Sequence, residues 1–199
     1  MTLNPTRLNT LSLKDVSTSQ RGAKSCAIVD ADGGPLTFQL GSRDKPVTSP
    51  FGASNFGDDT SVRKTIEFSL DDAQAFESVA EWARAYLYTH SERLFKKKLS
   101  MEAVRENFRP PATQKGDYRP LLRCKITTAG SHAVRCWNSR HERVDLPEDL
   151  RGIPVVAKIV MERLWIMSKE YGLVMTVTDL MISDDATSQW PFEEASAFG

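Results

Sequence analysis

The chain has 199 residues, of which 40% are hydrophobic and 26% are charged, which fits one globular domain with appendages and a real core. It contains no run of about 18 apolar residues, and its first fifteen residues, MTLNPTRLNTLSLKD, lack the pattern of a secretory signal. Three cysteines, an odd number without a CxxC pair, indicate a reducing compartment, so we expect a soluble intracellular protein without a membrane segment.

The formal net charge is zero, but the charges are segregated along the chain. Residues 1–90 hold 9 Lys/Arg and 11 Asp/Glu, residues 91–143 hold 13 and 5, and residues 144–199 hold 4 and 10. A basic middle followed by an acidic end predicts a face that binds a polyanion and an acidic tail in the same chain.

The first third of the chain predicts a polar arm followed by three strands. Residues 1–22 are polar and rich in Ser and Thr. Apolar runs at residues 25–31 and 36–40 flank Asp32-Gly33-Gly34-Pro35, which predicts a β-hairpin. A Gly/Pro/Ser-rich loop at 41–59 follows, and alternation at 62–70 predicts a third strand.

Residues 71–88 predict the one amphipathic helix inserted among the strands. Apolar side chains recur at three- and four-residue spacing, with Ser69 or Asp71 available as the N-cap. The residues expected to face the core are Phe76, Val79, Ala80, Ala83 and Leu87. A short helix at about 101–108, preceded by Ser100, and two strands at 121–127 and 132–138, joined by a turn, complete the middle of the chain.

Residues 150–182 predict two long strands joined by a turn at 168–172, with Gly172 in the left-handed conformation. The alternating apolar set of the first strand runs through Ile153, Val155, Ala157, Ile159, Met161, Trp165 and Met167, and in the second strand Leu173, Val177 and Met181 are expected to point inward. Because Leu164 and Ile166 interrupt the alternation, the buried face is expected to change near Glu162 and Arg163 through a bulge or bend.

These elements predict a mainly β (α+β) fold, a bent antiparallel OB-type barrel of about seven strands with an inserted helix. The domain is expected to span residues 23–182, with the helix at 71–88, after the N-terminal arm 1–22. Residues 183–199 contain four carboxylates, three aromatic residues and no basic residue, and they predict a flexible acidic tail. Its partner-binding residues are expected to be Asp184, Asp185, Trp190, Phe192, Glu193, Glu194 and Phe198. The tail could fold over the basic groove, dock partner proteins, or be inert.

No common catalytic motif is present: the chain lacks a P-loop, GxSxG, HExxH and GxGxxG. Cys124, His132, Cys136 and His141 lie close in sequence, but their spacing does not match a zinc knuckle, so we expect no metal and no cofactor. Paired aspartates such as Asp58-Asp59 favour solvated or capping roles over Mg²⁺ binding.

Basic and aromatic residues are interleaved in residues 91–143, the combination that holds single-stranded nucleic acid through phosphates and stacked bases. Burial in the core is the competing role for each aromatic residue. The candidate binding residues are Arg93, Phe95, Lys96, Lys97, Lys98, Arg109, Tyr118, Arg119, Arg123, Lys125, Arg135, Trp137 and Arg140, with Lys158, Arg163, Lys169 and Tyr171 of the long hairpin along one edge.

The sequence resembles the single-stranded-DNA-binding proteins of short-tailed phages and of large nucleo-cytoplasmic DNA viruses. The resemblance is clearest in VVAKIVMERLWIMSKEYGLVMTVTDLMI from Val155 onward. It extends to the Phe-Gln-Leu strand at Phe38, to the segment ERLFKKKLS that follows the helix, and to the acidic, aromatic C-terminus. It implies an OB fold, sequence-independent binding of single-stranded DNA in replication or recombination, homodimers, and a tail that recruits replication proteins.

We therefore predict a non-enzymatic protein that binds single-stranded DNA in replication, recombination or repair. The alternatives are a virion or assembly protein that does not bind nucleic acid and a metal-dependent nuclease. The sequence leaves the preference between DNA and RNA open, because contact with the 2′-hydroxyl leaves no motif.

Overall fold

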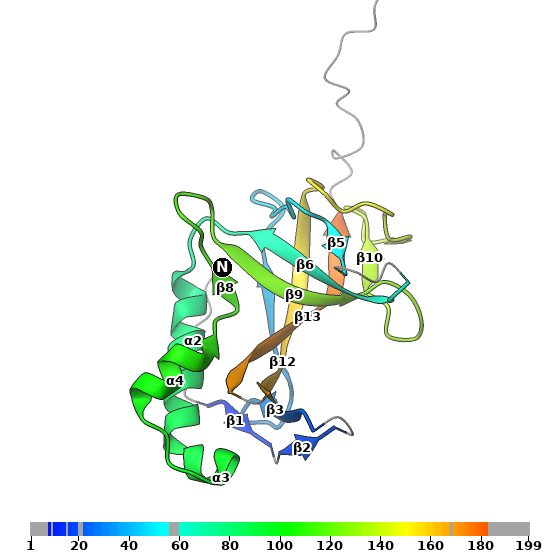
Figure 1. Ribbon diagram of the computed structural model, residues 1–199. Coiled ribbons are helices and arrows are strands. Elements are labelled where there is room, and N and C mark those ends of the chain that lie inside the picture. The colour runs from blue at the N-terminus through cyan, green and yellow to red at the C-terminus, as the bar shows by residue number, and fades with distance from the viewer. Residues whose placement is uncertain are drawn as a thin grey trace, which may run out of the picture.

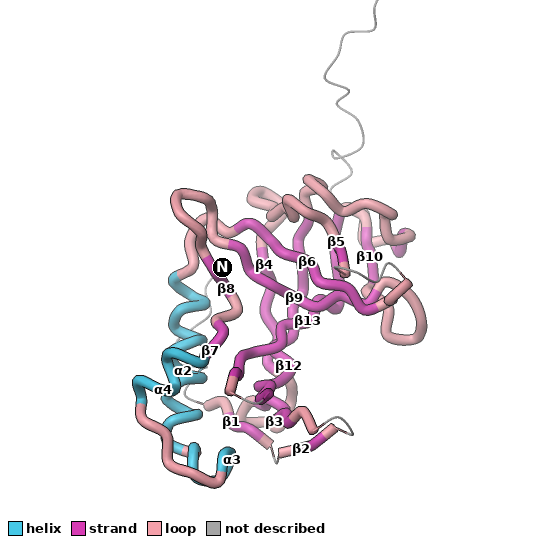
Figure 2. Tube along the Cα trace, in the orientation of Figure 1, coloured by secondary structure: helices cyan, strands magenta, loops and turns pink. Residues whose placement is uncertain are grey.

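A computed structural model describes residue 8 and residues 10–14, 16–19, 22–55, 60–167 and 169–182. The predicted tail, Phe56 and Asp58-Asp59 lie outside the described residues. Within them, the strands join into one sheet and three helices lie together on one side of it (Figures 1 and 2). The elements are β1 (Ser12–Leu13), β2 (Ser17–Thr18), β3 (Lys24–Val29), β4 (Leu36–Leu40), β5 (Ala53–Ser54), β6 (Arg63–Ser69), α2 (Gln74–Thr89), α3 (Ser91–Phe95), α4 (Met101–Asn107), β7 (Phe108–Arg109), β8 (Ala112–Thr113), β9 (Leu121–Thr127), β10 (Arg135–Trp137), β11 (Arg143–Val144), β12 (Val155–Met167) and β13 (Glu170–Ile182).

The long hairpin of β12 and β13 is the spine of the sheet, as its sequence predicts. The two strands pair antiparallel along their whole length, from Val155 opposite Ile182 to Met167 opposite Glu170. The register shifts between Met161 and Arg163, so the bulge predicted near Glu162 is confirmed. After it, Leu164 and Ile166 are buried, while Trp165 is half-buried and Met167 is 57% exposed. The expectation that Trp165 and Met167 continue the inward set is therefore wrong.

A second register shift, between Lys158 and Ile159, leaves Thr178 of β13 without a paired residue opposite it. Val177 and Leu180 are both buried, and Met181 is only half-buried. The extra residue turns the following side chains to the other face. Met181, predicted to point inward, thus lies on the outward side, and Leu180 takes its place in the core.

Shorter strands dock one after another along the two edges of this hairpin. β4 and β3 both pair with β12, at residues 157–161 and 163–166. β7, β9 and β10 follow one another in parallel along β13. Consecutive strands therefore continue each other along one edge, and the hairpin predicted between β3 and β4 is wrong.

The turn between β3 and β4 nevertheless forms locally. Asp30 N–H donates to the Gly34 carbonyl over 2.9 Å, and Gly33 has a φ of +77°. The chain makes this turn between two collinear strands and does not fold β4 back on β3. The turn chemistry was predictable, but the pairing partner was not.

The seven predicted strands correspond to β3, β4, β6, β9, β10, β12 and β13, and the sequence missed six strands of two residues each. Two of these, β1 and β2, pair with β3, and Leu8, Leu11 and Leu13 are buried, so the described part of residues 1–22 packs on the domain. The sheet is open in the order β1-β3-β12-β13-β9-β6-β5, in which no ladder between described strands closes a barrel. Residues 47–48 contact both β12 and β6, which no ladder joins directly. Val47 forms an isolated β-bridge with Val155 of β12, and Ser69 N–H of β6 donates to Thr48 O over 2.9 Å.

The helix α2 buries the five predicted residues but begins later than expected. It starts at Gln74, whose N–H donates to Asp72 Oδ1 over 3.0 Å. Neither Ser69 nor Asp71 is its N-cap, because Ser69 belongs to β6 and Asp71 pairs with Lys45. The helix α4 begins as predicted, since Ser100 Oγ accepts a hydrogen bond from Ala103 N–H. The short helix α3 was not predicted.

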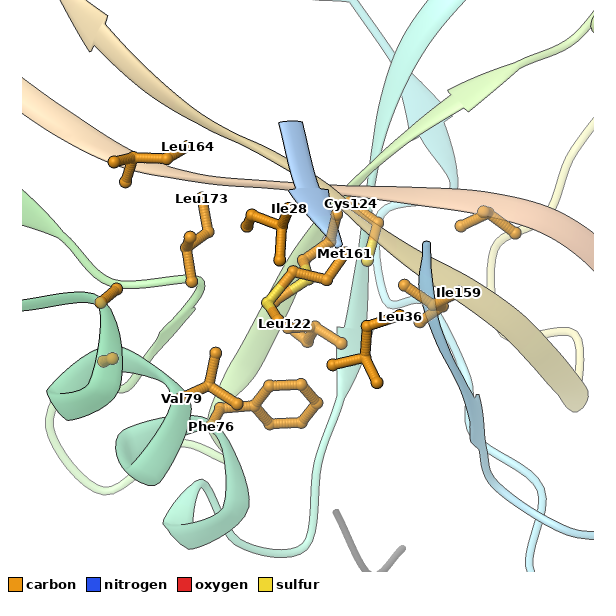
Figure 3. Close-up of a cluster of buried hydrophobic side chains, with 14 of the residues drawn as sticks. Ile28, Leu36, Phe76, Val79, Leu122, Cys124, Ile159, Met161, Leu164 and Leu173 are labelled. Carbon is orange, nitrogen blue, oxygen red and sulfur yellow. The ribbon is translucent and has the colours of Figure 1, made fainter. Parts of the chain in front are cut away.

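The core lies between the helices and the inner face of the sheet (Figure 3). Phe76 and Val79 of α2 meet Leu122 of β9, Ile28 of β3 and Met161 of β12 there. Each such side chain contributes about 1.5–3 kcal/mol when fully buried. Among the described residues, no helix covers the opposite face of the sheet (Figure 1).

Candidate nucleic-acid interface

Alternation along the strands places a second, polar set of side chains on the outward side of the sheet, called here the open face. In β9, Leu122, Cys124 and Ile126 are buried, so Arg123 and Lys125 point outward. The ladder between β6 and β9 places Arg63, Thr65 and Glu67 beside them. In β12 the same face carries Lys158, Arg163 and Trp165, the last two because of the bulge.

One groove, the Trp165 groove, has a volume of ≈ 610 Å³ and lies between β9 and the end of the β12–β13 hairpin that carries its turn. Trp165 is the aromatic side chain in its wall, together with the aliphatic Leu173, Val174 and Met175. Its cationic residues are Arg109, Lys115, Arg123 and Lys125. An indole beside four cations supplies both a stacking surface and phosphate partners.

Gly172 positions Trp165. It pairs with Trp165 across the hairpin, and a Cβ at Gly172 would lie 3.0 Å from both Cζ2 and Nε1 of the indole and 2.7 Å from the Arg109 carbonyl oxygen. The indole and the backbone of β7 therefore both approach a residue that must lack a side chain. Gly172 is not among the residues with positive φ, so its predicted role in closing the turn is wrong.

A second groove, the Trp137 groove, has a volume of ≈ 580 Å³ and lies between β4, β10 and the other end of the hairpin. Trp137, Lys158, Arg43 and Asp179 line it. The indole N–H of Trp137 donates to Asp179 Oδ1 over 3.1 Å, and the guanidinium of Arg143 lies 5.4 Å from the ring centroid. Trp137 is therefore held in place from one side while it lines the groove.

The two tryptophans lie on the same face, nine positions apart along β13, because Trp165 pairs with Gly172 and Trp137 pairs with Met181. At the rise of a strand this is at most about 30 Å. A single strand stacked at about 3.4 Å per phosphate covers that distance with about nine nucleotides. This lies within the range of about 4–16 nucleotides for sites of this type.

Carboxylates hold most of the arginines of the open face. Arg135 Nε lies 2.7 Å from Asp179, Arg123 lies 4.0 Å from Glu67, and Arg109 pairs with Glu170. Lys115, Lys125 and Lys158 form no ion pair within the described part of the chain. Together these residues, with Arg63, Arg163 and Glu162, make eight cations against four carboxylates, a net charge of +4.

Glu162, at the bulge, lies between the two grooves and contacts two of these arginines. Its Oε2 accepts a hydrogen bond from Thr176 Oγ1 over 2.7 Å and lies 3.5 Å from Arg63 Nη2, and its Oε1 lies 2.5 Å from Arg163 Nη2. A phosphate that binds either arginine must compete with this carboxylate.

Two pKa shifts follow from this crowding. Burial lowers the pKa of Lys125, and the positive charges of Arg123 and Arg63 lower it further. Burial acts to raise the pKa of Asp179, but the hydrogen bonds from Arg135 and Trp137 outweigh burial and lower it. Lys125 donates to Thr65 Oγ1 over 2.8 Å and has no carboxylate partner among the described residues. A phosphate beside it would therefore stabilise its charged form.

The predicted candidates divide into those that the structure brings together and those that it places elsewhere. Arg109, Arg123, Lys125, Arg135, Trp137, Lys158 and Arg163 lie on the open face or line its grooves. Tyr118 is 81% exposed in the loop between β8 and β9, where Arg119 lies 3.7 Å from Asp71. Arg140 lies 3.6 Å from Glu142 in the loop after β10.

Phe95 and Tyr171 lie on the core side and do not reach the grooves. Tyr171 is only 3% exposed, its hydroxyl donates to Ala103 O over 2.9 Å, and its ring centroid lies 5.4 Å from that of Phe95. Burial is the main cause that raises the pKa of Tyr171. Both rings pack, so neither belongs to the interface.

The remaining predicted cations lie outside the two grooves. Arg93, Lys96, Lys97 and Lys98 are exposed around the end of α3, and Lys169 is exposed at the hairpin turn.

Sequence reasoning missed Trp165 and Arg63 as candidates for the interface. Trp165 continued an apolar alternation, and only the bulge turns it outward. That interruption by Leu164 and Ile166 was the available signal. Arg63 lies outside the basic segment 91–143 and joins it only through the ladder between β6 and β9.

The described residues contain no group of three or more His, Cys, Asp or Glu side chains that could hold a metal ion. Cys124 and Cys136 are both buried, and burial raises the pKa of each thiol. None of the described helices is both long and apolar enough to cross a membrane.

No protein-family model matches the chain, and no curated protein matches it significantly. Among solved structures, the chain is similar to gp2.5, a single-stranded DNA binding protein encoded by bacteriophage T7, with a TM-score of 0.47, 10% identity, and coverage of 83% of this chain and 99% of that one. It is also similar to the single-stranded DNA-binding protein from bacteriophage Enc34, as a C-terminal truncation (TM-score 0.43, 8% identity, coverage 86% and 93%) and in complex with ssDNA (TM-score 0.38, 10% identity, coverage 86% and 91%). These values are too low to define a family for the chain.

Proposed function

We propose that this protein binds single-stranded DNA without sequence preference, along the open face of its sheet, in replication, recombination or repair. The observation that supports this most directly is the pair of tryptophans, each lining a groove with cationic residues on the same face. Stacking on an aromatic ring is worth about 1–3 kcal/mol per base and tolerates every base, because each base has a π-face.

The grooves favour a single strand over a duplex. The Trp165 groove offers the half-buried side chains of Trp165 and Val174 beside its cations, and a nucleic acid can contact these apolar surfaces only with unstacked bases. A duplex would present phosphates to the cations and leave the indole without a partner. Charge alone would therefore bind both forms, and Trp165 provides the preference.

Fluorescence titration with oligo-dT, at salt concentrations between 50 and 200 mM, tests this proposal. With between four and eight phosphate contacts, affinity should fall about 50- to 2000-fold over this range. Replacing Lys125 and Lys158 with Gln should weaken binding, whereas replacing Lys45 and Arg151, which lie off the open face in ion pairs, should not. No binding at 50 mM salt would refute the proposal and favour the assembly role.

The same preparation should be compared on single-stranded DNA, duplex DNA and RNA of equal length, because the grooves do not define the sugar. Incubation with Mg²⁺ tests the further proposal that the protein is not an enzyme. Cleavage of DNA that disappears in a Trp165→Ala variant would contradict it.

We also propose that the fold is an OB-type barrel left open at one seam. The bridges of residues 47–48 to Val155 and Ser69 support this, since they lie where a closing ladder would run. A homodimer and a tail that recruits replication proteins remain predictions from the sequence. Light scattering of the full chain would test whether it forms a dimer. The same measurement on a chain shortened at residue 183 would test whether the dimer needs the tail.

A further inference from the structure

A cluster of exposed cations lies away from the open face, in what is called here the basic turn: Arg93, Lys96, Lys97 and Lys98 at the end of α3. All four side chains are exposed, and none forms an ion pair within the described residues. The arginines of the open face, in contrast, are held by carboxylates. The basic turn therefore carries charge that no neighbouring acid neutralises.

The basic turn has a fixed conformation. Leu94 is only 2% exposed and anchors α3 in the core, and Lys96 ends the helix in the left-handed conformation with a φ of +60°. Ser91 Oγ donates to Tyr88 O over 2.9 Å and accepts from Leu99 N–H over 3.2 Å, which ties the two ends of the segment together. These contacts hold the lysines outward on a short, closed loop.

The basic turn also lies next to the hairpin end that borders the Trp165 groove, on the core side of the sheet. Phe95, next to Lys96, packs 5.4 Å from the ring of Tyr171 in β13. Tyr171 follows the hairpin turn, where Lys169 is exposed. Its neighbour Gly172 pairs with Trp165, and its neighbour Glu170 pairs with Met167 and lines the Trp165 groove. A strand that leaves the groove past the hairpin turn therefore meets Lys169 first and the basic turn next.

We propose that the basic turn extends the nucleic-acid track, and that it binds the phosphates of a single strand that leaves the Trp165 groove around the hairpin turn. This inference rests on the proposed function, and it makes the site longer than the two grooves. The basic turn offers charge without an aromatic ring free to stack, because Phe95 is already packed on Tyr171. It should therefore add salt-sensitive affinity without any preference among bases.

The test compares oligo-dT of about nine nucleotides, which fills the grooves, with oligo-dT of about twenty nucleotides, which can also reach the basic turn. The variant is Lys96→Gln/Lys97→Gln/Lys98→Gln. The control is Lys45→Gln/Arg105→Gln/Arg151→Gln, which removes the same charge from exposed residues elsewhere. Thermal unfolding should give the same Tm for both variants, since all six side chains are exposed.

We expect the lysine variant to bind the short oligonucleotide like the wild type and to lose salt sensitivity with the long one. Three lost phosphate contacts reduce the change in affinity between 50 and 200 mM salt by about 20-fold. An unchanged salt dependence with the long oligonucleotide, or an equal loss with both lengths, would overturn the inference. Short-oligonucleotide binding by the wild type, and its weakening by Trp165→Ala, report separately on the proposed function.

Discussion

Glu162 offers the sharpest test of how the open face works, because one carboxylate there holds two arginines. The substitution Glu162→Gln keeps the size of the side chain and an oxygen that can accept from Thr176 Oγ1, now 2.7 Å away. It removes the negative charge that attracts Arg63 and Arg163. Both arginines are then available to phosphates, and single-stranded DNA should bind more tightly.

The expected gain follows from the salt dependence of phosphate contacts. For single strands the slope is about −0.7 per contact, so relative to 1 M salt each added contact multiplies affinity by about 8 at 50 mM and by about 3 at 200 mM. One or two released arginines therefore increase affinity about 8- to 65-fold at 50 mM, and about 3- to 10-fold at 200 mM. The variant should also show a steeper salt dependence than the wild type.

Quenching of tryptophan fluorescence by oligo-dT measures both quantities. Glu148→Gln is the matched control, because Glu148 is exposed and makes no ion pair in the described residues, and its removal changes the net charge equally. If Glu162→Gln binds no more tightly than Glu148→Gln at 50 mM salt, the carboxylate does not compete with phosphate, and the reasoning is refuted.

Three further predictions concern the Trp165 groove. Trp165→Ala should weaken binding of oligo-dT about 5- to 150-fold, the equivalent of one stacked base, while Trp165→Phe should retain most of it; equal loss in both would argue against stacking. Affinity for oligo-dT should fall as pH rises through the lowered pKa of Lys125, because only the charged amine pairs with phosphate. A Lys125→Arg variant titrated over the same pH range should not show this fall. Gly172→Ala should lower stability by about 1–3 kcal/mol, and Tm by roughly 2–12 °C in calorimetry, because its Cβ would lie 2.7 Å from the Arg109 carbonyl oxygen; an unchanged Tm would contradict this packing.

The local features of the fold could be predicted from the sequence, whereas the strand pairings could not. The helical spacing of Phe76, Val79 and Leu87, the cap at Ser100 and the bulge at Glu162 are all encoded within a few residues. The hairpin predicted at Asp32–Pro35 failed for a different reason. The Gly-containing turn forms from its own residues, but the partner of β3 and β4 is β12, about 120 residues later in the chain.

The candidate interface divides in the same way. The charge count singled out the basic segment, and Arg109, Arg123 and Lys125 of that segment line the Trp165 groove. It could not indicate that carboxylates from both flanking segments, such as Glu67 and Glu170, would lie against these cations. Charge is additive along a sequence, but the field at a surface depends on which strands are neighbours.

The docking of strands in series along the hairpin also has a consequence for how the protein is made. β3, β4, β7, β9 and β10 each complete their pairing on β12 or β13, which are synthesised after all of them. On the ribosome, the first 150 residues therefore expose unpaired strand edges until the hairpin emerges. Such long-range pairing is typical of folding on the millisecond-to-second scale, and it leaves the nascent chain open to aggregation. Translation pauses or chaperones that act after residue 137 should therefore affect the yield of folded protein more than those that act earlier.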